Sequence, residues 1–162
     1  MKSHAYEAHV RWTGAGHGPT VDYRTYSREF TADVAGKPQL TGSSDPAYRG
    51  DPAVHNPEEL LLIALSSCHL LSYLALCVRN GVQVLAYEDH ATATMAERDG
   101  KMRFIEAVLH PRCTVSGDVQ TATRLHEQAH AECFIANSVN FPVRNEPVVN
   151  GTTLPAEAHY SA

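Results

Sequence analysis

The residues of this 162-residue chain best suited to chemistry are its four cysteines. Cys68 stands out because two serines precede it and His69 follows it, in a segment otherwise made largely of leucine and alanine. Polar groups in such a segment cost free energy unless they are paired, so the cluster predicts a functional face around a reactive thiol. Cys133, late in the chain, is the second candidate. Cys77 and Cys113 are interpreted as small buried hydrophobic residues.

A second pattern is the pentapeptide HEQAH, which has the form of the H-E-x-x-H zinc motif. His126 and His130 lie one helical turn apart and can bind zinc, and Glu127 can act as the general base. A third ligand is needed, and only Glu146 or Glu157 could supply a carboxylate from downstream. A zinc metalloprotease is therefore the remote alternative, and the motif is interpreted as a solvated helix face.

Composition narrows the class of protein. The net charge is −5 and the chain has no basic run, which argues against nucleic-acid partners and against binding to an anionic membrane. Hydrophobic residues make up 43% and charged residues 19%, as in an ordinary globular protein, so we expect one domain over residues 1–162. Cysteines without a visible secretory signal favour a reducing compartment and predict a cytoplasmic protein. No cofactor and no metal are expected.

The element that must position Cys68 is a long helix from Asn56 to Gly81. Asn56 is a good N-cap, Glu58 favours the positive end of the helix dipole, and Gly81 suits the C′ position. The helix approaches the length of a membrane span, but its polar residues favour a buried core helix. Because it is apolar on nearly every face, we expect a second sheet, a second helix or another subunit to cover it.

The remaining pattern predicts an α+β fold with a mainly antiparallel sheet. We expect an N-terminal β-meander and loop over residues 1–55, then the central helix over 56–81. A β-hairpin, a second helix and a last strand follow over 82–150, and a tail over 151–162. The expected elements are strands at Ala5–Thr13, Thr20–Val34, 38–43, Val82–Glu97 and Met102–Ser116, a helix from Asp118 to Cys133 or Phe134, and a strand within 145–154.

Cys68 requires a cation to become a thiolate, and the helix dipole cannot supply it. The cysteine lies about 18 Å from the helix N-terminus at a rise of 1.5 Å per residue, and the dipole effect fades within the first turn. His69 is about 100° round the helix and is poorly aimed at the sulfur. An arginine from another element is the better candidate.

The motif Asn-Pro-Glu-Glu-Leu-Leu from residue 56, with a cysteine ten residues after Glu58 and a second one at Cys133, resembles the OsmC/Ohr family. This family comprises the osmotically inducible protein C and the organic hydroperoxide resistance proteins. The resemblance implies an intertwined homodimer that reduces organic hydroperoxides, and possible reduction of hydrogen peroxide as well. In this scheme Cys68 attacks the O–O bond and Cys133 closes a disulfide, which a lipoyl-type dithiol reduces.

The resemblance also implies an activating arginine held by Glu58. This chain has no arginine where the family places it, just after the first strand; Arg28, then Arg24, and last Arg49 are the substitutes. Phe134 stands after the second cysteine where many members have proline. These departures are typical of a divergent branch.

The spacing of Glu58 and Cys68 adds an inference of its own. On a straight helix they lie about 15 Å apart and cannot share an arginine within one chain. Unless the helix breaks near its start, Glu58 serves the site of a second subunit, which favours a homodimer. A non-enzymatic protein that binds a hydrophobic ligand or senses redox state remains the alternative, and the segment Phe134–Pro142 is expected to line the pocket.

Overall fold

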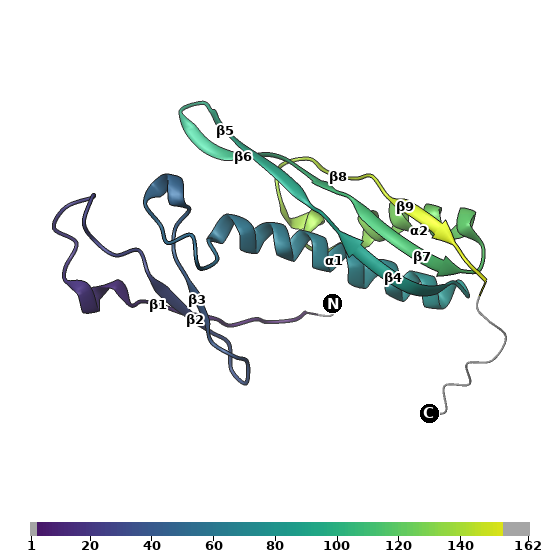
Figure 1. Ribbon diagram of the computed structural model, residues 1–162, viewed down its shortest axis with the longest axis horizontal. Helices are drawn as coiled ribbons and strands as arrows, with labels where there is room; N and C mark the ends of the chain where they lie inside the picture. The colour runs from purple at the N-terminus through teal and green to yellow at the C-terminus, as the bar shows by residue number, and fades with distance from the viewer. Residues whose placement is uncertain (1–2, 154–162) are drawn as a thin grey trace. The chain divides into compact units, whose positions relative to one another are not determined.

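The computed structural model describes residues 3–153, and the chain divides into two compact units, Met1–Leu61 and Leu62–Ala162. Each unit is described separately. The helix α1 (Pro57–Arg79) begins in the first unit and continues into the second (Figure 1). It spans the predicted region without a break, as the capping signals predict. The tail expected over 151–162 lies, from residue 154 onward, outside the described residues.

The first unit contains a three-stranded antiparallel sheet of β1 (His9–Trp12), β2 (Phe30–Asp33) and β3 (Leu40–Gly42), in that order. Two 3₁₀ turns, η1 (Gly14–His17) and η2 (Pro46–Tyr48), interrupt its loops. The predicted meander is present, but the strand expected over Thr20–Val34 is confined to its last residues. Tyrosine and threonine before Phe30 have high strand propensity, and here they form turns without a neighbouring strand to pair with.

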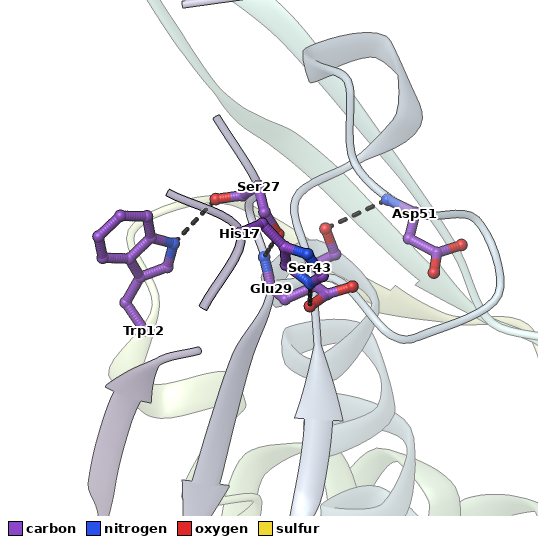
Figure 2. Close-up of polar contacts among 6 residues, drawn as sticks. All are labelled: Trp12, His17, Ser27, Glu29, Ser43 and Asp51. Carbon is purple, nitrogen blue, oxygen red and sulfur yellow. Dashed lines mark hydrogen bonds and ion pairs between the residues drawn. The ribbon is translucent and has the colours of Figure 1, made fainter. Parts of the chain in front are cut away.

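Polar contacts fix the loops of this unit, as Figure 2 shows. The indole Nε1 of Trp12 donates to the carbonyl of Ser27 at 2.8 Å, and the hydroxyl of Ser43 accepts the N–H of Asp51 at 3.1 Å. His17 lies 3.4 Å from Glu29. These contacts hold a chain segment that has little regular structure of its own.

Both ends of α1 are capped by the chain itself. Asn56 accepts the N–H of Glu59 at 2.8 Å, while the Glu59 carboxylate accepts the N–H of Asn56 at 3.2 Å, which is a capping box. At the other end, Gly81 has a φ of 70° and the N–H of Val82 donates to the carbonyl of Cys77 at 2.9 Å. This is a Schellman motif, in which glycine takes the left-handed position.

The second unit is built on two long strands, each divided by a break. The first comprises β4 (Gln83–Asp89) and β5 (Thr92–Arg98), and the second comprises β6 (Lys101–Leu109) and β7 (Pro111–Ser116), as Figure 1 shows. They pair antiparallel through the predicted Asp99-Gly100 turn, where both residues have positive φ. The strands expected at Val82–Glu97 and Met102–Ser116 are therefore present, each in two segments.

The last part of the chain differs more from expectation. Two short strands, β8 (Val143–Asn145) and β9 (Val148–Gly151), replace the single expected one. They pair parallel with β6 and β7, which gives the sheet orders β5-β6-β8 and β4-β7-β9. Each of these two sheets therefore has one antiparallel and one parallel strand pair. The predicted α+β class is confirmed.

The second helix, α2 (Val119–Glu132), has Asp118 as its N-cap, since this carboxylate accepts the N–H groups of Gln120 and Thr121. The helix ends at Glu132, and Cys133 is its C-cap with an extended backbone. The prediction that Cys133 lies within the helix is therefore wrong by one position. The core between α1, β7 and α2 contains Tyr73, Leu76, Cys77, Cys113, Val115, Ala122, Leu125 and Ala129.

A second cluster lies nearer the middle of α1. Leu65, Ala107 and Leu109 are buried there, and the segment after Cys133 contributes Ile135, Ala136, Val139 and Phe141, beside the 3₁₀ turn η3 (Ala136–Ser138). Among the described residues, α1 is the one helix long and apolar enough to cross a membrane. It contributes buried residues to both clusters, as expected of a core helix in a globular protein.

Candidate active site at the α1–α2 contact

Cys68 and Cys133 are neighbours in the second unit. Cys68 lies half-buried near the middle of α1, and its thiol is close enough to raise the pKa of the fully buried Cys133 thiol just after α2. Both are free thiols. Sixty-five positions separate them in the sequence, and the packing of the two helices brings them together. The arrangement is that of a dithiol with one accessible and one buried member.

The two thiols differ in their surroundings. Burial, and then the hydrogen bond with Cys68, raise the pKa of Cys133 to about 11. The backbone N–H of Ala136 points at the Cys133 sulfur at 3.4 Å and acts in the opposite direction. Cys133 is therefore a protonated thiol at neutral pH, with a donor already in place that would stabilise its thiolate.

Behind the thiols lies a pair of fully buried histidines. The Nε2 of His69 on α1 and the Nδ1 of His126 on α2 are 3.0 Å apart. The ring planes are only 13° apart and their centroids are 5.4 Å apart, so the hydrogen bond runs nearly along both ring planes. Burial is the largest cause that lowers the pKa of His69 to about 4 and that of His126 to about 3. Both imidazoles are neutral at pH 7, so one ring can donate its N–H to the unprotonated nitrogen of the other.

The histidine pair continues into a buried Tyr–Cys cluster. The Nε2 of His126 lies 3.6 Å from the Cys113 sulfur, which lies 3.4 Å from the hydroxyl of Tyr73. Tyr73 also stacks on the His126 ring with a centroid separation of 3.7 Å. Burial raises the pKa of Cys77, Cys113 and Tyr73 alike. Cys77 and Cys113 are buried, as predicted, and Cys113 also has polar contacts with Tyr73 and His126.

The H-E-x-x-H segment is not a solvated face, contrary to expectation. His126 is fully buried, and its two ring nitrogens are occupied by His69 and Cys113. Glu127, the next residue along α2, is exposed. Within residues 3–153 no group of three or more histidine, cysteine or acidic side chains is placed to hold a metal ion. The motif instead supplies a core histidine, a role that its spacing alone did not reveal.

The second histidine of this motif, His130, lies three positions before Cys133. It is half-buried one turn before Cys133, and its charge is the second cause, after burial, of the lowered pKa of His69. Its Nδ1 atom is buried and has no hydrogen-bond partner among the described residues, and the same holds for the Nδ1 of His69. Asp89 on β4 opposes the effect of His130 on His69.

Asp89 itself connects α1 with the sheet. Its carboxylate accepts the Ser66 hydroxyl at 2.5 Å and the His110 N–H at 2.7 Å, at the point where β6 gives way to β7. A cavity of about 380 Å³ opens here, lined by Ser66, Ser67, Leu70 and Asp89 among others. The two serines before Cys68 thus line this cavity, and Ser66 also connects α1 to the sheet. The sequence indicated only that polar residues gather around Cys68.

The other predicted residues belong to the first unit. Glu58 is half-buried in the first turn of α1, and its Oε2 atom is buried without a hydrogen-bond partner within residues 3–153. The Arg28 guanidinium donates to the carbonyls of Tyr26 at 2.8 Å and Tyr23 at 2.6 Å, and lies over both rings. Arg24 is exposed. Their roles stay predictions.

The second unit defines an α+β protein in which two helices and a sheet of mixed strands enclose the core. The family model for OsmC-like proteins matches residues 50–146, and this chain belongs to that family. An OsmC-like protein of unknown function from Vibrio cholerae O1 biovar eltor is 30% identical, with a TM-score of 0.83, over 90% of this chain and 100% of its own. The OsmC/Ohr resemblance is confirmed.

More distant structures share the fold. An organic hydroperoxide resistance protein from Elizabethkingia anophelis is 15% identical, with a TM-score of 0.68, over 93% of this chain and 99% of its own. The organic hydroperoxide resistance protein OsmC from Legionella pneumophila is 14% identical, with a TM-score of 0.69, over 93% of this chain and 99% of its own. The comparison with curated proteins finds no match.

Proposed function

We propose that this chain is a cysteine-based hydroperoxide reductase. The Cys68 thiolate attacks the O–O bond of an organic hydroperoxide, giving a Cys68 sulfenic acid and an alkoxide that takes up a proton to become the alcohol. The Cys133 thiol then displaces the sulfenic hydroxyl, which leaves as water, and a Cys68–Cys133 disulfide forms. A dithiol of the lipoyl type reduces this disulfide and is itself oxidised to a cyclic disulfide.

The proposal is supported by the free, half-buried Cys68 on α1 and the free, buried Cys133 after α2, whose pKa the Cys68 thiol raises. Exposure supports the assignment of roles, because a peroxide with an organic group can reach half-buried Cys68 and cannot reach fully buried Cys133. The names of the Elizabethkingia and Legionella proteins point to organic hydroperoxides as the substrate class.

The activating cation is proposed to come from the first unit. Glu58 has an unpaired buried carboxylate oxygen, which suits an arginine. Arg28 and Arg24 are the candidates, and Arg28 must first leave the two tyrosine carbonyls that it now binds. Because α1 is unbroken between Glu58 and Cys68, the carboxylate and the thiol of one chain are about 15 Å apart and belong to different sites.

A homodimer follows from the same argument and from the surface of α1. Ile63, Leu71 and Val78 are about one-half to four-fifths exposed and lie at spacings of eight and seven residues, on one side of the helix. A second copy of the chain is proposed to cover this stripe. We also propose that the protein acts in the cytoplasm, where free cysteines are maintained.

The test is a single-turnover experiment with one equivalent of cumene hydroperoxide and thiol mapping by mass spectrometry. The wild type is expected to form a Cys68–Cys133 disulfide, Cys133→Ser to accumulate Cys68 sulfenic acid, and Cys68→Ser to react at the background rate. Cys77→Ser is the matched control and is expected to form the disulfide. With a lipoyl dithiol present, wild type should turn over. Peroxide consumption equal in wild type and Cys68→Ser would exclude the enzyme and favour the ligand-binding or redox-sensing alternative.

A further inference from the structure

The two sulfurs of the proposed disulfide differ in how a reductant can reach them. Cys68 is half-buried, whereas Cys133 is only 1% exposed. Thiol–disulfide exchange begins when a thiolate attacks one sulfur and expels the other, so access decides which sulfur is attacked. Attack on Cys68 makes Cys133 the leaving group. The surroundings of the Cys133 sulfur then determine how fast the disulfide opens.

Burial makes Cys133 a poor leaving group. It is the largest cause that raises the pKa of this thiol to about 11, and a thiolate of high pKa leaves slowly. A hydrogen-bond donor aimed at the sulfur would offset this effect. Such a donor favours the thiolate over the thiol, because a hydrogen bond to an ionised acceptor is about twice as strong as one to a neutral acceptor.

The backbone N–H of Ala136 is such a donor. It lies 3.4 Å from the Cys133 sulfur, and it lowers the pKa of the thiol against the effect of burial. Two further hydrogen bonds fix the backbone on either side. The N–H of Cys133 donates to the His130 carbonyl at 3.2 Å, and the N–H of Asn137 donates to the Cys133 carbonyl at 3.0 Å. The donor is therefore in place before any thiolate forms.

We infer that the Ala136 N–H stabilises Cys133 as the leaving thiolate and so directs reduction of the disulfide to Cys68. A thiolate of the dithiol reductant attacks the Cys68 sulfur, the S–S bond breaks, and its electron pair goes to the Cys133 sulfur, which then takes up a proton. The second thiolate of the reductant attacks the reductant sulfur of the mixed disulfide and releases Cys68 as a thiolate. The reductant ends as a cyclic disulfide. This inference rests on the proposed roles of Cys68 and Cys133.

The direction of opening can be tested on the wild type without peroxide. Diamide oxidises the two thiols to the disulfide, and 2-mercaptoethanol, a monothiol that cannot close a ring, then opens it before an acid quench. Mapping by mass spectrometry is expected to find mercaptoethanol on Cys68 and a free thiol at Cys133. Mercaptoethanol on Cys133 would overturn the inference.

The donor is tested by replacing Ala136 with lactic acid, which turns the N–H into an ester oxygen and keeps the methyl side chain. We expect mercaptoethanol to open this disulfide about tenfold more slowly, as for loss of one hydrogen bond to a charged group, with the adduct still on Cys68. A local loss of fold would instead expose Cys133 and speed its reaction. Opening at the wild-type rate or faster would overturn the inference.

The matched control is the same replacement at Ala53. Its N–H donates to the Asp51 carboxylate at 2.8 Å, so this variant also loses one backbone hydrogen bond, in a loop of the first unit. We expect its disulfide to open at the wild-type rate. An equal slowing in both variants would show that the effect is not specific to the Ala136 N–H and would overturn the inference.

A peroxide arm distinguishes this inference from the proposed function. Cumene hydroperoxide replaces diamide as the oxidant of the wild type and is expected to give the same disulfide. If only diamide forms it, the proposed function fails while the direction of opening stands on the diamide result. If neither forms it, both fail. If both form it and mercaptoethanol ends on Cys133, the function stands and this inference fails.

Discussion

The Nε2 of His69 and the Nδ1 of His126 meet at 3.0 Å inside the core, although the two residues are 57 positions apart in the sequence. Neither ring contacts solvent. The pair ties α1 to α2, and His69 directly follows Cys68 in the sequence, so the helix that presents Cys68 is held to α2 by this hydrogen bond.

Stability should decline in mild acid. The folded-state pKa values of about 4 for His69 and about 3 for His126 lie below the unfolded value of 6.5. Between pH 6.5 and about 4 the unfolded chain binds protons that the folded chain does not, so the free energy of unfolding falls as pH falls, by up to about 1.4 kcal/mol per pH unit for each proton. Above pH 6.5 these two histidines contribute no slope.

Urea titrations across pH 4–8 measure this slope. His69→Gln should be less stable than wild type at pH 7 and should show a shallower slope below pH 6.5, because one titrating ring is gone. His90→Gln serves as the control and should keep the wild-type slope. Equal slopes in wild type and His69→Gln would show that the acid sensitivity arises elsewhere.

Tyr73 contributes to the stability of the core through both its hydroxyl and its ring. Two substitutions separate these contributions. Tyr73→Phe keeps the ring stacked on His126 and removes the hydrogen bond between the hydroxyl and the Cys113 sulfur. We expect a loss of about 0.5–1.5 kcal/mol in the free energy of unfolding. Tyr73→Leu also removes the stacking and opens space in the core, so its loss should be larger, about 2–5 kcal/mol.

Chemical denaturation of both variants at pH 7 gives the two values. A loss for Tyr73→Phe as large as that for Tyr73→Leu would assign the stabilisation to the hydroxyl alone. A loss near zero for Tyr73→Phe would show that the hydrogen bond to sulfur contributes nothing.

Asp89 should contribute more to the free energy of unfolding than Ser66, whose hydroxyl it accepts. Asp89→Ala leaves the His110 N–H and the Ser66 hydroxyl without their acceptor, whereas Ser66→Ala removes one of two hydrogen bonds to the carboxylate. We expect a loss of about 1–3 kcal/mol for Asp89→Ala and a smaller one for Ser66→Ala. Amide hydrogen exchange at His110 provides the local measurement and should accelerate in Asp89→Ala only.

The two helices were largely predictable from the sequence, whereas the roles of Cys68 and Cys133 stay predictions. The N-cap at Asn56 and the C′ glycine at Gly81 are local signals, and the structure shows the capping box and the Schellman motif that they indicate. Cys68 was recognisable from its polar neighbours. Cys133 was found through the family pattern, and no local signal placed it beside Cys68.

The histidine network was not predictable, and the reason is physical. His69 and His126 gain their roles from each other across the core, and neither segment alone indicates the pairing. The spacing of H-E-x-x-H suggested a metal or a solvated face, whereas burial and the position of Cys113 decided the outcome. Strand breaks at His90 and His110 and the parallel strands β8 and β9 also depend on long-range pairing.

The exposed apolar stripe of α1 predicts the behaviour of the protein in solution. Leu71 is 66% exposed and Val78 is 79% exposed, and placing a carboxylate there should prevent a second copy from covering the helix. The measurement is size-exclusion chromatography with light scattering. We expect a mass of two chains for the wild type and a mass closer to that of one chain for Leu71→Asp. Met102→Asp, at an exposed apolar position on β6 away from α1, is the matched control and should remain dimeric. A wild type with the mass of a single chain would exclude an active site shared between two copies, because the stripe would then be uncovered. If folded Leu71→Asp loses both the dimer and peroxide turnover, the result would support a shared active site.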